Sequence, residues 1–262
     1  MVGYQMSTST SKRYNFTIST TGLLVVLLFW HLLARRFNPL VLPSPAETWT
    51  ALKELAVSGS LFTNLWITVR RTLIGYGAAI LTGFTLAVIL KASSFWQLVF
   101  RPLITIIQTI PPIVWLVLAV IWFGIAEEIT PIFLIFVVTF PVIFINVFSG
   151  LKSIDLYLVE MARVYRCTRR QVILDIYLPA LIPHLVSAVS IGLAFAWKSS
   201  VFAEFIGSSS GIGFALSMAN SNLETEELFA WALVLVGLML IFEYLIIQPI
   251  QRYVTRWNRH GE

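Results

Sequence analysis

Long apolar segments alternate with short polar segments along most of the chain. Six of the apolar segments contain 17 residues or more, and they cover 18–34, 65–90, 102–123, 131–148, 181–206 and 229–250. About 20 apolar residues in a helix cross the hydrocarbon core of a bilayer, because each residue adds about 1.5 Å. The pattern therefore predicts an all-α, polytopic membrane protein with six transmembrane helices.

The composition supports a membrane protein, and the sequence indicates no ATPase domain within it. The 262-residue chain is 58% hydrophobic and 12% charged, whereas about 25% of the residues in a soluble domain are charged. No polar connection is long enough to form a separate soluble domain, and no phosphate-binding sequence G-x-x-x-x-G-K-[ST] occurs. We therefore predict that the chain is not an enzyme, and that any ATP-driven transport uses the ATPase of another polypeptide.

The residues that bind metals or catalyse reactions are few and scattered. Cys167 is the only cysteine, so an intrachain disulfide and a cysteine metal cluster are both excluded. His31, His184 and His260 lie far apart and lack metal-ligand or catalytic spacing. We predict no metal site, no cofactor and no catalytic residue in this chain.

The chain divides into a short tail and one membrane domain. Residues 1–15 are polar and rich in Ser and Thr, and we predict a cytoplasmic tail there, followed by a single transmembrane domain over 16–262. In the first outer connection, Ser44-Pro45-Ala46-Glu47 predicts the start of a helix. Proline suits the first helical turn, and an acid near it complements the helix dipole.

One polar interruption, Glu160 to Pro179, is unusually basic. It contains four arginines and only two acids, and its apolar residues recur at helical spacing. Leu178 is predicted to end this helical insert, because the residue before a proline is pushed out of the helical region. Composition alone leaves three interpretations open: a helix on the membrane surface, a solvated loop, or a docking surface for a soluble partner.

The positive charges select one orientation. With both termini cytoplasmic, twelve of the 18 Lys and Arg residues lie inside and five lie outside, which agrees with the positive-inside rule. The basic insert is then cytoplasmic, and the acidic segments 127–128 and 224–227 lie outside.

The second span carries features that predict how it packs. Arg70 and Arg71 lie in its first turns, where long side chains can reach the interface. Gly75, Gly77 and Gly83 permit close contact with a neighbouring helix. A short turn over residues 91–101 is predicted to follow.

Two features within the spans are candidates for a translocation path. Pro111 and Pro112 fall in the middle of the third span, and prolines there kink or break a helix. Gln108 and Thr109 lie one turn earlier, which favours a path lining over a purely structural kink. Lys198 lies inside the fifth span and either faces the path or pairs with another helix, because an unpaired charge in lipid is costly.

Several segments resemble one transporter family. Glu160-x-Ala162 followed by Ile176-x-Leu178-Pro179 resembles the EAA loop in permease subunits of binding-protein-dependent ABC importers. Three other segments resemble the same family in the correct order: LPSPAETWTAL (42–52), QTIPPIVWLVLAVIWFG (108–124) and AWKSSVFAEFIGSSSGIG (196–213). The first of these resembles the nitrate, sulfonate, taurine and bicarbonate branch.

The resemblance implies a fold, partners and site residues. It implies the type I importer permease fold, in which a coupling loop over 150–180 contacts an ATPase. The partners would be two ATPase subunits that bind ATP and Mg²⁺, a second permease copy, and an external binding protein, in the inner or plasma membrane of a prokaryote. No nucleic acid is implied. The residues implied to dock the ATPase are Glu160, Ala162, Arg163, Arg166, Leu178 and Pro179.

The implied function is import of a small solute by alternating access. The branch suggests an organic or inorganic anion, such as a sulfonate, taurine or nitrate, or a vitamin precursor. The alternative is a secondary transporter or channel driven by an ion gradient. That mechanism requires paired carboxylates in the membrane and inverted repeats, whereas Glu243 is the single candidate and no repeat is visible.

The chain departs from the family at Arg166, where glycine is usual. Glycine permits a turn with positive φ, a conformation that costs other residues about 1–2 kcal/mol. Either the turn is made differently here, or the two short helices of the loop continue as one.

Overall fold

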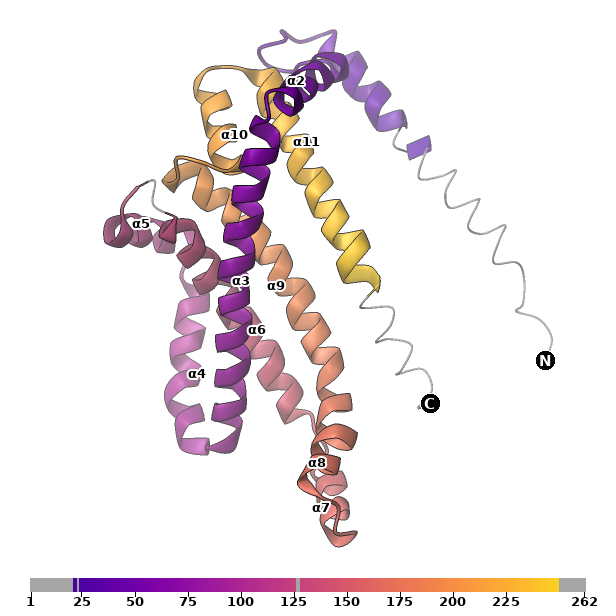
Figure 1. Cartoon of the computed structure of the whole chain (residues 1–262), viewed down its shortest axis with the longest axis vertical. Coiled ribbons are helices and arrows are strands. Elements are labelled where there is room, and N and C mark those ends of the chain that lie inside the picture. Colours follow the sequence, from indigo (N-terminus) through magenta and orange to yellow (C-terminus); the bar gives the residue numbers. More distant parts are fainter. Residues whose placement is uncertain (1–20, 23, 126–127, 250–262) are drawn as a thin grey trace, which may run out of the picture.

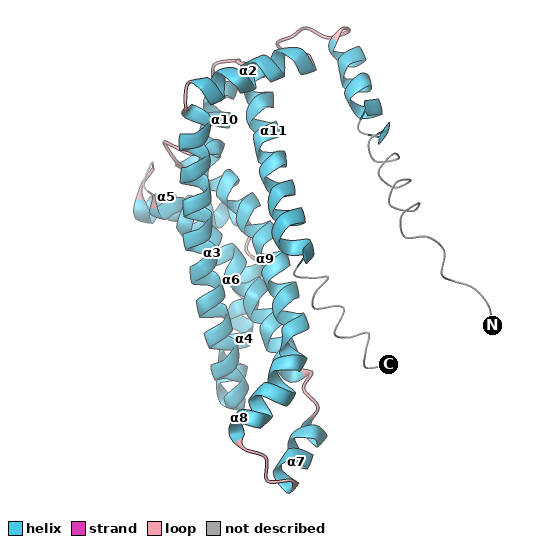
Figure 2. Cartoon of the chain, turned by 45° about the vertical axis from the view of Figure 1, so that its right-hand side comes forward, coloured by secondary structure: helices cyan, strands magenta, loops and turns pink. Residues whose placement is uncertain are grey.

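A computed structural model of the chain describes residues 21–22, 24–125 and 128–249. Every element in the described part is helical, and the long helices lie roughly side by side (Figures 1 and 2). The elements after the first helical stretch are α2 (Pro45–Val57), α3 (Ser60–Ala92), α4 (Ser94–Thr109), α5 (Pro112–Phe123), α6 (Ile129–Lys152), α7 (Leu156–Val164), α8 (Arg169–Gln171), the π-helical segment η1 (Val172–Tyr177), α9 (Leu178–Gly207), α10 (Ile212–Ser221), α11 (Thr225–Phe242) and the π-helical segment η2 (Glu243–Ile247).

The described residues contain four or five candidate membrane spans. Four helical stretches are long and apolar enough, namely Ser60–Ala92, Ile129–Lys152, Arg169–Gly207 and Thr225–Leu245. A fifth candidate is the pair α4 and α5, which meets at a bend of 95°. The first predicted span lies partly outside the described residues, and Leu24–Ala34 is its described apolar helix. The all-helical membrane fold is confirmed, and the count of six stays a prediction.

Helix α6 forms the centre of the bundle, between α3 and α9. The close approach of α3 to α6 depends on Gly75 and Gly83. A Cβ atom added at Gly75 would lie 2.8 Å from the carbonyl oxygen of Ile132, and one at Gly83 would lie 3.0 Å from the side chain of Ile143. Gly77 instead faces open space. The predicted glycine packing is therefore confirmed at two of its three positions.

The predicted turn over residues 91–101 is wrong. Helix α3 continues to Ala92 and α4 begins at Ser94, so the chain reverses at Ser93, whose backbone is extended. Pro102 lies inside α4. The polar residues of this region are divided between the end of α3 and the start of α4. They lie close together in the sequence, as they would in a loop, but the backbone that carries them is helical.

The predicted helix end at Leu178 is also wrong. Leu178 has helical backbone angles, and the helix continues from η1 into α9 across Pro179. The N–H of Leu178 donates to the carbonyl oxygen of Ile173 in the wider π pattern. A π turn displaces the carbonyl that a proline ring would otherwise contact, so the proline does not terminate the helix.

The break at Pro111 and Pro112 is confirmed and has a local cause. Pro111 has no N–H to donate to Ile107, four residues earlier. The indole Nε1 of Trp115 donates to that carbonyl oxygen instead, at 3.2 Å. The freed acceptor is thus satisfied inside the protein, which is the condition for breaking a helix in a membrane.

Helix α2 begins as the sequence predicts. Ser44 and Glu47 form a reciprocal capping box, in which each side chain accepts from the backbone N–H of the other residue. The hydrogen bonds from Ser44 lower the pKa of Glu47. Helix α2 packs against α11 and lies with α10 at the same end of the bundle (Figure 1).

Candidate functional site

Helices α7 and α8 form a hairpin beyond the ends of α3 and α4, at the opposite end of the bundle from α2 and α10 (Figure 1). Asp155 caps α7 by accepting from the N–H of Tyr157 at 2.8 Å. Thr168 and Gln171 form a capping box at the start of α8. Each short helix therefore has its own start signal, and the basic insert is two helices joined by a turn.

Arg166 makes the turn between these helices with a φ of +57°. The N–H of Cys167 donates to Ala162 at 2.9 Å, and the N–H of Arg166 donates to Arg163 at 3.0 Å. These two bonds form the motif that commonly ends helices with a glycine in the left-handed conformation. Both alternatives for Arg166 are therefore wrong: the two helices do not continue as one, and arginine makes the turn in the backbone conformation that glycine favours.

Arg166→Gly is therefore expected to stabilise the loop by about 1 kcal/mol, because glycine adopts positive φ without strain. Amide hydrogen exchange of Cys167, whose N–H closes the turn, measures this effect. Slower exchange in the variant is expected. Equal or faster exchange would show that the arginine side chain compensates for the backbone strain.

The hairpin presents a mixed basic and apolar surface. Val159 and Ala162 are buried, and α7 packs against η1. Glu160, Arg163 and Arg166 are exposed on the other sides of the hairpin. Large apolar side chains are also exposed on the hairpin and on the adjoining segment η1: Leu156, Tyr157, Leu158, Met161, Val164, Tyr165, Ile173 and Leu174.

Of the residues implied to dock an ATPase, Glu160, Arg163 and Arg166 are accessible. Ala162 is 5% exposed, so it contributes to the packing of the hairpin. Leu178 is 41% exposed and lies in the continuous helix leading into α9.

A buried ion pair joins α3 to α9 near the other end of the bundle. The Nη1 atom of Arg71 lies 3.2 Å from the Oε1 atom of Glu204, and the side chains are 1% and 0% exposed. The hydroxyl of Thr68 donates to Glu204 Oε2 at 2.7 Å. Both charges are therefore compensated within the protein.

The same pair positions the connection between α9 and α10. Arg71 donates to the carbonyl oxygen of Ser210 at 2.8 Å and to the hydroxyl of Ser208 at 3.0 Å. Glu204 accepts from the N–H of Gly213 at 3.2 Å. A Cβ atom at Gly211, which has a φ of +101°, would lie 2.4 Å from the carboxyl carbon of Glu204.

The predicted interfacial position of Arg71 is therefore wrong, because packing of α3 against α9 and α10 covers it. Arg70, the preceding residue, does extend to the surface and pairs with Glu128. The sequence contained a usable signal for the buried pair. Arg71 lies near the start of one predicted span and Glu204 near the end of another. The predicted topology places both on the same side of the membrane, where opposite charges can meet.

Lys198 lies on the exposed surface of α9, and within the described part of the chain it makes no hydrogen bond or ion pair. It lines a hollow of about 460 Å³ together with Pro111 and Pro112. Thr109 is exposed and donates to Thr105 at 2.8 Å. The structure thus brings three of the five candidate path residues to one hollow, and leaves Gln108 and Thr109 outside its lining.

The position of Lys198 requires a polar environment in the membrane. A lysine at the centre of a membrane helix costs about 2.5–3.5 kcal/mol in insertion experiments. The described residues supply no counter-charge that would offset this cost.

The described residues form a polytopic helical membrane protein with a basic hairpin at one end and an unpaired lysine between the two ends. Residues 79–260 match the profile of the family described as "Binding-protein-dependent transport system inner membrane component". The chain belongs to this family.

Individual proteins support the same assignment. The putative aliphatic sulfonates transport permease protein SsuC of Bacillus subtilis (strain 168) is 28% identical, over 96% of this chain and 91% of that protein. The taurine transport system permease protein TauC of Escherichia coli (strain K12) is 29% identical, over 94% and 90%. A chain of the MetNI methionine ABC transporter in an inward-facing conformation has the same fold, with a TM-score of 0.58, 22% identity, and coverage of 73% and 93%.

The chain is thus the permease component of a binding-protein-dependent ABC importer, a multi-pass protein of the inner membrane. Such systems include an ATPase and a binding protein as partners, and the permease itself hydrolyses no ATP and carries no cofactor. The alternative of a transporter or channel driven by an ion gradient is therefore wrong.

Proposed function

We propose that two copies of this chain, each with six spans and cytoplasmic termini, enclose a path that opens alternately to the two sides of the membrane. An external binding protein delivers the solute at the end that carries α2 and α10. ATPase subunits contact the hairpin of α7 and α8 at the other end. The proposal includes a cytoplasmic tail over residues 1–15, which lie outside the described part of the chain.

The composition of the hairpin surface carries this proposal. Tyr157 and Val164 are 81% and 80% exposed, and both lie on a short helix that also presents Glu160 and Arg163. Exposed apolar patches of this kind, rimmed by charges, mark sites of protein contact. A loop that remained solvated would have no reason to expose so many large apolar side chains.

The hairpin is also suited to transmitting motion. The backbone stays helical from Arg169 to Gly207, so α8, η1 and α9 form one 39-residue helical stretch. A displacement of the hairpin by an ATPase is therefore passed directly to the helix that carries Lys198. The stretch continues through Leu178 and Pro179.

The substrate we propose is a small anion. The relatives are named for the transport of aliphatic sulfonates and of taurine, compounds that carry a sulfonate group, and the basic side chain of Lys198 in α9 is compatible with such a group. Pro111, Pro112 and Lys198 are the proposed path residues that share a hollow. Gln108 and Thr109 are exposed one turn before the break and complete the proposed lining.

Native mass spectrometry of the complex purified from membranes tests the assembly. We expect two copies of this chain bound to two ATPase subunits. One copy of this chain together with a different permease would contradict the homodimer. Recovery of the chain without any ATPase would contradict the docking role of the hairpin.

A further inference from the structure

Lys198 interrupts an exposed apolar stripe along α9. Side chains on one face of a helix recur every three or four residues, and here this face carries Ile191, Phe195, Lys198, Phe202 and Phe205. All five are exposed in the isolated chain, and four of them are apolar. A single cationic group therefore lies within a surface that otherwise attracts apolar groups.

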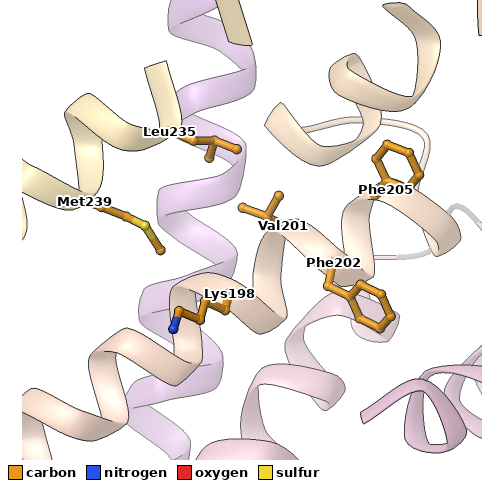
Figure 3. Close-up of a pocket in the computed structure, with 6 residues that line it drawn as sticks. All are labelled: Lys198, Val201, Phe202, Phe205, Leu235 and Met239. Carbon is orange, nitrogen blue, oxygen red and sulfur yellow. The ribbon is translucent and has the colours of Figure 1, made fainter. Parts of the chain in front are cut away.

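Two hollows meet at this lysine. The hollow of about 460 Å³ has Ser199 as its other polar lining residue. The second, of about 340 Å³, is lined by Lys198 and apolar residues that include Leu235 and Met239 of α11 (Figure 3). Lys198 and Phe202 line both hollows. The surface of both hollows is almost entirely apolar, and Lys198 is the charged residue among those that line them.

The acidic groups on neighbouring elements leave this ammonium group free. Glu204, on the same helix, is buried and paired with Arg71. Glu243 follows Met239 by four residues, and no ion pair joins it to Lys198. An unpaired cation with apolar surroundings attracts an anion more strongly than it would in water, because the local dielectric constant is lower.

We infer that Lys198 binds the anionic head group of a small organic monoanion, such as an alkanesulfonate, whose apolar body lies against Phe195 and Phe202. This inference rests on the proposed function and narrows its substrate class. Apolar walls match a hydrocarbon body. They provide few hydrogen bonds to replace the water around a fully hydrated inorganic ion such as nitrate.

Protection of the lysine from acetylation tests binding directly. The complete complex is treated with N-acetoxysuccinimide, and acetylation of Lys198 is followed by mass spectrometry. Butanesulfonate is expected to slow acetylation of Lys198 at least fivefold. The neutral butanesulfonamide and nitrate should have no effect at equal concentration, and Lys53 serves as the control. Absence of protection, or equal protection by nitrate, would overturn the inference.

Uptake into proteoliposomes containing the complete complex tests the functional role. Lys198→Met is expected to lower ATP-driven uptake of radiolabelled butanesulfonate at least tenfold, whereas Lys198→Arg should retain at least a third. Lys91→Met, at the far end of α3, should transport at the wild-type rate. Wild-type uptake by Lys198→Met, or a wild-type complex that takes up nitrate and no butanesulfonate, would overturn the inference.

Glu243 provides the remaining control. If Glu243→Gln causes the same loss and the double variant recovers, Lys198 pairs with Glu243 across the two copies, and the ligand role is wrong. Butanesulfonate uptake that needs no ATP would contradict the proposed function. In that case the acetylation experiment still decides the role of Lys198.

Discussion

Glu204→Ala is expected to destabilise the protein by about 3–5 kcal/mol, the usual cost of removing one partner from a buried ion pair. The substitution leaves the guanidinium of Arg71 1% exposed with no counter-charge. It also removes the acceptor for Thr68 and for the N–H of Gly213. Reversible unfolding in mixed micelles of dodecyl maltoside and SDS, followed by circular dichroism, gives the free energy of unfolding.

The neighbouring arginine supplies a matched control. Arg70 pairs with Glu128 at the surface, where both side chains are about half exposed, and such pairs contribute about 0–1 kcal/mol. Arg70→Met should therefore change stability by less than 1 kcal/mol. The double variant Arg71→Met/Glu204→Gln should be less destabilised than the sum of its single changes, because it removes both charges together. Similar effects of Glu204→Ala and Arg70→Met would contradict the structural role of the buried pair.

Local chemistry accounts for most of the features that the sequence predicted correctly. The apolar runs mark membrane helices because an unpaired backbone polar group in lipid is costly. The break at Pro111 and Pro112 follows from the missing N–H of proline. The start of α2 follows from the pairing of Ser44 with Glu47, only three residues apart. None of these features depends on which helices become neighbours.

The features that could not be predicted depend on tertiary packing. Arg71 and Glu204 are separated by 133 positions in the sequence, and their contact exists because α3 and α9 lie together. The π turn before Pro179 and the single-residue reversal at Ser93 have no distinctive local signal in the sequence. The positive φ of Arg166 is also not predictable, because the sequence alone does not give the backbone strain that the folded chain tolerates.

Glu160→Lys is expected to abolish ATP-driven uptake while the protein still inserts in the membrane at its normal level. Glu160 is exposed on α7 and is the acidic member of a surface that otherwise carries Arg163 and Arg166. Reversing its charge makes the surface around Arg163 and Arg166 more basic and places a like charge against any basic group of a partner. Uptake by proteoliposomes and quantitative immunoblotting of membranes measure the two quantities.

A charge reversal at Glu243, outside the hairpin, provides the comparison. Glu243→Lys tests whether a charge reversal outside the hairpin also blocks transport. Transport alone does not separate the two variants, so binding of the ATPase is measured as well. The decisive comparison is the affinity for the ATPase subunit, which Glu160→Lys should lower at least tenfold and Glu243→Lys should leave unchanged. Normal uptake by Glu160→Lys would contradict a docking role for α7.

Cys167 allows the most direct measurement of coupling through the hairpin. It is the only cysteine of the chain and is exposed in the turn between α7 and α8. A membrane-impermeant maleimide should label it in inside-out vesicles and not in right-side-out vesicles. The bound ATPase should slow labelling at least tenfold, and Glu160→Lys should remove this protection. Labelling from the outer side, or at the same rate with and without the ATPase, would contradict the account.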